Sequence, residues 1–435
     1  MPLDAAILAQ ADRGPILNVL STVGGKPAAD WLTAGHLAAD GQLPRTWKKV
    51  ADAGLVDAHF VEVCAIAGPN HCIDGWSYAA RALSAILAGD FHAARHLAYY
   101  AQLRAGLSIL AGLGIGIFNK INFIIDASGA MKRLDTGKQG VGTHTIVWQA
   151  LEAWAGDPST AVAFVDLMRI KGTTLREALD SIWPSFSPTT VAGALIEGWG
   201  LDLKRGEREH VYRNISSYAP QGLNPLAQSA VDVVQFVEEA WRLFEPHGGA
   251  GFDELDRHLL RSMLHKLRSI VEDEAQPIEE GSIGTRYEYL PPAIQSLASL
   301  EFLRDTSVAG EPNLLRLARS TADPAMPLEM MARALLLLRT ATAFTHSNFA
   351  DAGIDSAQGQ LNAWLHEMAV QRGFWPPGTP TAPADLWDDV ELALIDFADA
   401  AAPPPACFHD WLGKPEKGLP VLAQAERITL WSLTA

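Results

Sequence analysis

The chain has 435 residues, of which 48% are hydrophobic and 19% are charged. This composition is typical of a protein with a large buried core and argues against a disordered chain. Asp and Glu number 50 against 34 Lys and Arg, so the formal net charge is −16. Such a surface repels nucleic acid and anionic membrane, and any contact with nucleic acid must come from a local basic patch.

Cysteine content and apolar stretches indicate the compartment. The three cysteines, Cys64, Cys72 and Cys407, give no disulfide framework and fit a reducing environment. The N-terminus lacks a basic region followed by an apolar run, and the longest apolar stretch, Ala105 to Phe118, is shorter than the ~20 residues of a membrane span. We therefore expect a cytoplasmic protein without membrane contact, and we interpret this stretch as the buried end of a core helix.

Apolar residues recur at helical spacing along most of the chain. We expect Asp74 to cap a helical stretch from Gly75 to Leu110, which Gly89-Asp90 divides into two packed helices. Further helices are predicted at 143–156, 228–244, 252–275, 327–344, 385–401 and 424–433. The helix at 327–344 is apolar on most sides and is therefore expected at the centre.

The predicted fold is all-α, with one or more multi-helix bundles. The sequence shows no convincing series of strands and no repeat, and the one short β segment we expect is Thr285 to Tyr289. Breaks near 130 and at 276–290 indicate an N-terminal region 1–130, a central region 131–285 and a C-terminal region 286–435. One compact unit is the alternative.

The sharpest motif lies in the segment 204–214, KRGEREHVYRN. Arg205, His210 and Tyr212 have the spacing Arg-x4-His-x-Tyr, which resembles the signature of the HEPN superfamily. These are helical-bundle proteins, and many are metal-independent ribonucleases of bacterial defence and toxin systems. The resemblance implies that Arg205 clamps a phosphate, that His210 is the acid–base group and that Tyr212 corresponds to the tyrosine of the toxin branch. A histidine can move the 2′-hydroxyl proton, and an arginine can hold the phosphate.

Two features of this segment bear on the resemblance. Gly206 stands where the family prefers a polar residue such as Asn or Asp. Residues five apart on an ideal helix are about 140° from each other, so Arg205 and His210 do not share a face. We therefore expect Arg205 in the entry turn of the helix, or a second subunit that completes the site. The alternative interpretation is a charged surface helix.

Two further groups of basic residues are candidates for holding RNA. The first flanks the motif and consists of Lys204, Arg208 and Arg213. The second forms one stripe of the 252–275 helix at 3-4-3 spacing and consists of His258, Arg261, His265 and Arg268. The alternative interpretation of the stripe is a solvated face that pairs with an acidic neighbour.

Metal and nucleotide sites are not expected. His92 and His96 stand four apart, a spacing that suits one metal ion, but no Glu-x-x-His or His-Glu-x-x-His motif completes a site. We interpret the pair as part of a packed polar seam between helices. The loop 137–143 follows Lys132, where a Walker A loop requires glycine. We therefore predict no metal and no other cofactor.

Two functions remain open from the sequence. The first is a helical interaction or scaffold subunit of a bacterial multi-protein system, which binds a protein partner or forms a homodimer. The second is a metal-independent endoribonuclease, built around Arg205 and His210, that acts on RNA in anti-phage defence or as a toxin. A ribonuclease needs these two side chains close together in a positive cleft, whereas a scaffold leaves them solvated or paired with acids.

Overall fold

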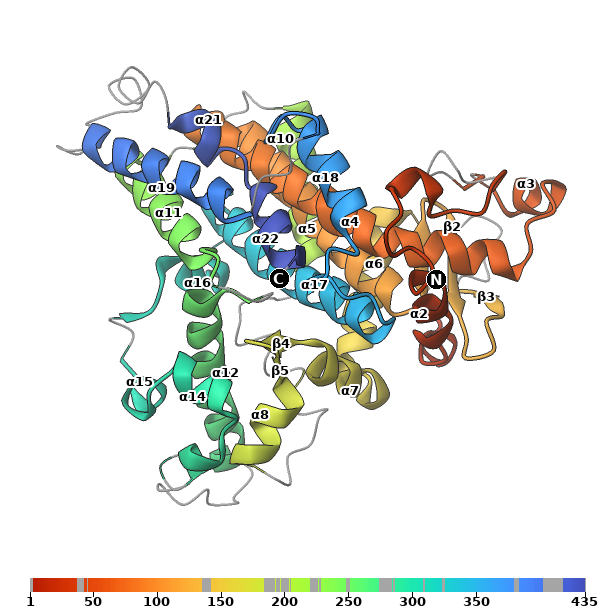
Figure 1. Cartoon of the computed structure of the whole chain (residues 1–435), viewed down its shortest axis with the longest axis horizontal. Coiled ribbons are helices and arrows are strands. Elements are labelled where there is room, and N and C mark those ends of the chain that lie inside the picture. The colour runs from red at the N-terminus through yellow and green to blue at the C-terminus, as the bar shows by residue number, and fades with distance from the viewer. Residues whose placement is uncertain are drawn as a thin grey trace.

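The computed structural model describes residues 3–36, 43–44, 46–134, 142–183, 192, 196, 203, 205–219, 226, 228–247, 251–273, 284, 286–307, 310–322, 325–378, 383–401 and 418–434. Helices dominate these residues, and a few short strands accompany them (Figure 1). The predicted all-α, multi-helix fold with a minor β component is therefore confirmed. None of the described helices is both long enough and apolar enough to cross a bilayer.

Three long helices form the centre of the fold. They are α4 (Asp57–Leu87), α5 (Phe91–Gly112) and α17 (Pro327–Asp351), and each packs against the other two. Almost every residue of α17 is buried, as its apolar pattern predicts. A Cβ on Gly75 would lie 2.6 Å from Leu338 Cδ2, so α4 approaches α17 closely because residue 75 is glycine.

The boundary between α4 and α5 follows the sequence signals. Gly89 adopts a φ of 73°, which suits the residue just beyond a helix end. Asp90 then caps α5 by accepting a hydrogen bond of 3.0 Å from the backbone amide of Ala93. The predicted division at Gly89-Asp90 is therefore confirmed.

The predicted cap at Asp74 is wrong. Helix α4 begins at Asp57 and continues without interruption through Pro69 and Asp74. The Asp74 carboxylate instead lies 3.4 Å from Arg104 Nη1 on α5. In the sequence alone, a polar residue that pairs with a neighbouring helix thus resembles a residue that caps the start of a helix.

A three-stranded antiparallel sheet follows α5. Its strands are β1 (Ile115–Phe118), β2 (Ile121–Ile125) and β3 (Met131–Arg133), in the order β1-β2-β3. The interpretation of the whole stretch to Phe118 as a helix end is therefore wrong beyond Gly112. The chain turns at Gly114, which has a φ of 84°.

Two smaller features complete the β structure. Strands β4 (Arg169–Ile170) and β5 (Thr173–Thr174) form a hairpin whose two central residues both have positive φ. The extended segment expected at 285–289 is wrong, because Tyr287–Tyr289 forms a 3₁₀ turn, η2. The minor β component thus lies elsewhere in the chain than predicted.

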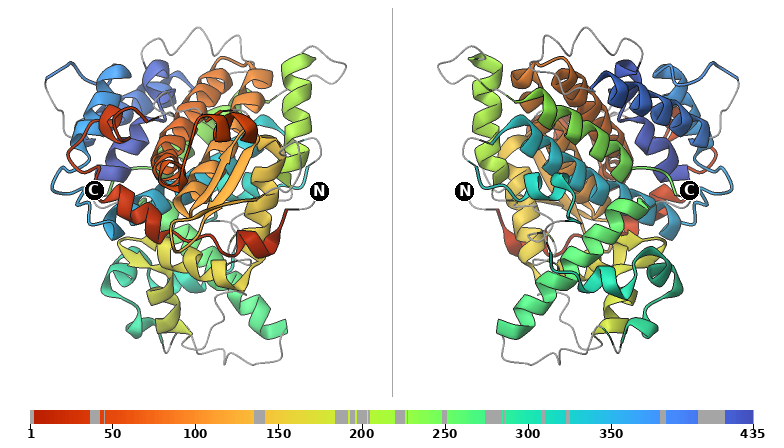
Figure 2. Two further views of the ribbon diagram at one scale, coloured as in Figure 1. Left: turned by 90° about the vertical axis from the view of Figure 1, so that its right-hand side faces the viewer. Right: turned by 90° about the vertical axis from the view of Figure 1, so that its left-hand side faces the viewer.

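Shorter helices surround the central three (Figures 1 and 2). Their bounds are α1 Ala5–Leu8, α2 Gly14–Leu20, η1 Ala28–Asp30, α3 Trp47–Asp52, α6 Thr143–Gly156, α7 Pro158–Leu167, α8 Leu175–Ile182, α10 Arg205–Tyr218, α11 Ala230–Leu243, α12 Asp253–Asp273, α14 Pro292–Leu297, α15 Leu300–Arg304, α16 Asn313–Ala318, α18 Asn362–Gln371, α19 Pro383–Ala400, α21 Leu419–Leu422 and α22 Arg427–Thr434. Figure 2 shows α10 at the edge of the molecule. It packs there against α5 and α6.

Packing crosses both predicted regional boundaries. Helix α17 of the C-terminal region lies on α4 and α5 of the N-terminal region, and α10 of the central region also lies on α5. The described parts of all three regions contribute to one apolar core. The boundaries near 130 and 285 stay a prediction.

Candidate functional site

Helix α10 carries the Arg-x4-His-x-Tyr motif and runs antiparallel to α5. Arg95 of α5 meets Ser216 of α10, whereas Tyr99, one turn further along α5, meets His210, which lies earlier on α10. Helix α6 lies beside both. We call this contact region the α5–α6–α10 seam, and it consists of His92, Arg95, His96, Tyr99 and Tyr100 of α5, His144 and Trp148 of α6, and His210, Tyr212, Arg213, Ser216 and Ser217 of α10.

His210 belongs to a stack of aromatic rings in this seam. Its ring lies parallel to that of His144, with centroids 4.8 Å apart and 6° between the planes, and 5.7 Å from the ring of Tyr99. The Tyr99 hydroxyl lies 3.2 Å from His144 Nδ1 and accepts a hydrogen bond of 3.3 Å from Trp148 Nε1. The stack fixes both imidazole planes, while His210 stays only half-buried.

Both imidazoles of the stack are neutral at pH 7. Burial first, and then the Arg213 charge and the proximity of His210, lower the pKa of His144 from 6.5 to about 4. Burial and the Arg213 charge also lower the pKa of His210. Each neutral ring therefore has one nitrogen that can accept a hydrogen bond or a proton, and His210 Nε2 lies 3.5 Å from Asn214 Nδ2.

Arg213 is the arginine that accompanies His210. It lies three residues further along α10, on the same face, and is 8% exposed. It donates hydrogen bonds to the Tyr100 hydroxyl and, at 2.6 Å, to Asn214 Oδ1, and its Nη2 lies 3.3 Å from His144 Nε2. No carboxylate among the described residues forms an ion pair with it. A guanidinium that is buried among neutral groups is well suited to bind an anion.

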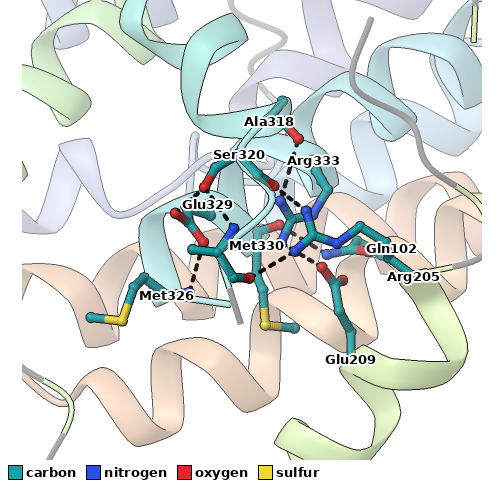
Figure 3. Close-up of polar contacts among 10 residues, drawn as sticks. Gln102, Arg205, Glu209, Ala318, Ser320, Met326, Glu329, Met330 and Arg333 are labelled. Carbon is teal, nitrogen blue, oxygen red and sulfur yellow. Dashed lines mark hydrogen bonds and ion pairs between the residues drawn. The ribbon is translucent and has the colours of Figure 1, made fainter. Parts of the chain in front are cut away.

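Arg205 lies beside Ser320 and not beside His210 (Figure 3). It donates to the carbonyl oxygen of Ser320 and, at 2.8 Å, to that of Ala322, both in the turn that precedes α17. No contact between Arg205 and His210 exists in the described part of the chain. The role of Arg205 as a phosphate clamp stays a prediction, and Arg213 occupies the position beside His210 that this role requires.

A buried ion pair holds α10 in place next to Arg205. Glu209 pairs with Arg333 of α17, and the two residues are 1% and 3% exposed (Figure 3). Burial raises the pKa of Glu209, and the Arg333 charge opposes this shift. Removal of either partner would leave a buried charge unpaired, at a cost of about 3–5 kcal/mol. The pair therefore fixes the rotation of α10 that turns His210 and Arg213 towards α5.

The other residues of the motif segment have different surroundings. Tyr212 is half-buried, and the Arg95 guanidinium carbon lies 5.7 Å from its ring centroid. Arg208 is exposed on α10. Lys204 lies outside the described residues. Of the residues proposed from the motif, His210, Tyr212 and Arg213 thus meet in the seam.

The predicted basic stripe of α12 faces α15 rather than α10. His258 and Arg261 are each 5% exposed, and they pack against the Phe302 ring at 5.2 and 4.6 Å. His265 Nε2 lies 3.1 Å from a backbone carbonyl oxygen of α15. The side chain of Arg268 is outside the described part. His258 and Arg261 would have to be uncovered before they could contact a phosphate.

His92 and His96 contact hydroxyl groups of α10. His92 Nδ1 lies 3.3 Å from Ser216 Oγ, and His96 Nδ1 lies 2.5 Å from Ser217 Oγ. Burial, and the positive charges of the seam, lower the pKa of both histidines. Within the described ranges, no three His, Cys, Asp or Glu side chains are grouped so that they could hold a metal ion.

Comparison of the chain with protein-family models, with curated proteins and with solved structures finds no match. The seam is therefore interpreted from its own chemistry.

Proposed function

We propose that the α5–α6–α10 seam binds a phosphodiester and that the protein is a metal-independent endoribonuclease. One observation carries the proposal: two stacked, neutral imidazoles, His144 and His210, lie beside the buried guanidinium of Arg213, which has no described carboxylate partner. Neutral imidazole accepts a proton, and arginine binds phosphate oxygens. The motif Arg-x4-His-x-Tyr, which resembles the HEPN signature, supports the same reaction.

The proposed reaction needs only the protein and RNA. His210, which is half-buried, takes the 2′-hydroxyl proton. The 2′ oxygen then forms a bond to phosphorus, and the bond from phosphorus to the 5′ oxygen breaks. Protonated His210 returns the proton to the leaving oxygen, which gives a 2′,3′-cyclic phosphate and a 5′-hydroxyl end. Arg213 stabilises the charge that develops on the phosphate.

Single-stranded RNA incubated with the purified chain and EDTA tests the proposal. We expect cleavage with 2′,3′-cyclic phosphate ends, and a rate about 10²–10⁴-fold lower for His210→Ala, since this is the usual contribution of general acid–base catalysis. His247→Ala is the matched control, because His247 is an exposed histidine after α11, outside the seam. Intact RNA, or equal cleavage by His210→Ala, would overturn the proposal.

A second candidate function is an interaction subunit, favoured by apolar side chains on the outer face of α10. Val211, Ile215 and Tyr218 are 54%, 46% and 83% exposed and stand four and three residues apart, on one side of the helix. Such a stripe fits a protein partner or a second copy of the chain. Under this proposal, Val211→Asp with Ile215→Asp would abolish a complex seen by size-exclusion chromatography, and an unchanged complex would contradict it.

The setting of either function is also a proposal. A role in bacterial defence follows only from the HEPN resemblance. A cytoplasmic location follows from the low cysteine content and the composition of the chain.

A further inference from the structure

Arg95 carries a buried positive charge that the proposed reaction does not use. It is 3% exposed, and its Nε donates a hydrogen bond of 2.7 Å to Ser216 Oγ. Within the described residues, its two terminal nitrogens have no hydrogen-bond partner, and no carboxylate forms an ion pair with it. Burial lowers the pKa of this guanidinium. Because these terminal nitrogens have no acceptor among the described residues, an anion that entered here could bind both of them through charge-assisted hydrogen bonds.

Arg95 and Arg213 differ in this respect from the other buried arginines of the described chain. Each of the others has a carboxylate partner, and the pairs are Arg261 with Asp305, Arg333 with Glu209, Arg339 with Asp256 and Arg427 with Asp389. The two exceptions lie in the same seam, in a chain with a net charge of −16. A shortage of acidic residues therefore does not explain them.

The two arginines are placed one after the other along the seam. Ser216, the partner of Arg95, stands three residues beyond Arg213, which is about 4.5 Å along the axis of α10. Tyr212 packs against Arg95, and Tyr100 packs against Arg213, with its ring centroid 4.9 Å from the guanidinium carbon. Both guanidiniums are thus held by an aromatic ring and a hydroxyl group.

We propose that Arg95, together with Ser216 and His92, binds the phosphate next to the one that is cleaved. The seam then prefers a strand with at least two consecutive phosphates over a single dinucleotide linkage. The identity of the strand as RNA rests on the proposed function. The binding of a phosphate at Arg95 does not rest on the proposed function, because it needs no cleavage chemistry.

Salt-dependent binding of a fluorescent 2′-O-methyl oligonucleotide tests this site. The oligonucleotide lacks the attacking hydroxyl, so binding is measured without cleavage. The logarithm of the affinity falls with the logarithm of the salt concentration, and loss of one phosphate contact on a single strand reduces that slope by about 0.7. We expect this reduction for Arg95→Gln. Arg176→Gln is the control, because Arg176 of α8 already pairs with Asp166, and its slope should equal that of the wild type.

A second variant covers the case in which Arg95→Gln does not fold. Arg95→Lys keeps the charge but loses the planar fork that binds two phosphate oxygens, so we expect affinity at least about tenfold weaker, as for one lost hydrogen bond to a charged group. An unchanged slope for Arg95→Gln, or unchanged affinity for Arg95→Lys, would exclude a phosphate at this position. If RNA is cleaved but the two Arg95 variants bind as the wild type does, the ribonuclease proposal holds and the phosphate site at Arg95 is excluded. If the two Arg95 variants show the expected changes but RNA stays intact, the anion site holds and the ribonuclease proposal is excluded.

Discussion

Individual histidines of the seam should make the stability of the fold depend on pH. The pKa of His144 is about 4 in the folded chain against an ordinary value of 6.5. Below pH 6.5 the unfolded chain gains a proton at this residue, whereas the folded chain gains it only near pH 4. The unfolded state therefore binds more protons in this window, and stability falls as the pH falls through it. The lowered pKa values of His92, His96 and His210 act in the same direction.

Urea unfolding between pH 4 and 7.5 measures this dependence. We expect His144→Gln to lose less stability towards pH 4 than the wild type does, because residue 144 then no longer titrates. His247→Gln, which replaces an exposed histidine, should keep the wild-type pH dependence. Identical curves for His144→Gln and the wild type would show that the seam does not hold His144 neutral.

Part of the site could be predicted from single residues. The motif gives His210 and Tyr212, and a helix with 3.6 residues per turn places Arg213 rather than Arg205 beside His210. His144 could not be found in this way. Only the packing of α6 against α10 brings it there, and that contact joins segments more than sixty residues apart.

At the scale of elements, the contact between α6 and α10 explains why residue 206 is glycine. A Cβ on Gly206 would overlap the indole ring of Trp148. Residue 206 must therefore be glycine for α10 to begin where it does, because a larger side chain has no room. The same indole donates the hydrogen bond to Tyr99 that orders the ring stack.

Gly206→Ala should consequently destabilise the protein and slow RNA cleavage. Alanine improves helix propensity by up to about 1 kcal/mol, but overpacking costs about 1–3 kcal/mol, so the loss prevails. Gly156→Ala is the control, since a Cβ at this last residue of α6 would meet nothing within 4 Å. Urea unfolding and the cleavage assay measure both variants. A Gly206→Ala protein as stable and active as the wild type would contradict the packing argument.

The helices could be predicted because their sequence signals are local. The sheet could not be predicted from such signals. Caps and breaks such as Asp90 act on the adjacent turn of the chain. All five residues of β2 are buried, so this strand lacks the alternation of polar and apolar residues by which a half-buried strand is recognised. In the sequence, β2 follows the apolar end of α5 and resembles a continuation of that helix.

The whole molecule should unfold in one step. Helix α17 is buried against α4 and α5, so the C-terminal region cannot separate without exposing the centre of the N-terminal region. We expect tryptophan fluorescence and far-UV circular dichroism to give coincident urea curves. Two or three separate transitions would instead support independent units with boundaries near 130 and 285.

The hydrogen bonds of Arg205 connect the start of α10 to the turn before α17. Arg205 is the first residue of α10, and its hydrogen bonds to the carbonyl groups of Ser320 and Ala322 couple the position of this helix end to that of the turn. A displacement of the turn would therefore also displace the start of α10. His210 and Arg213 would then shift relative to α5, and the spacing that the proposed proton transfer requires would change.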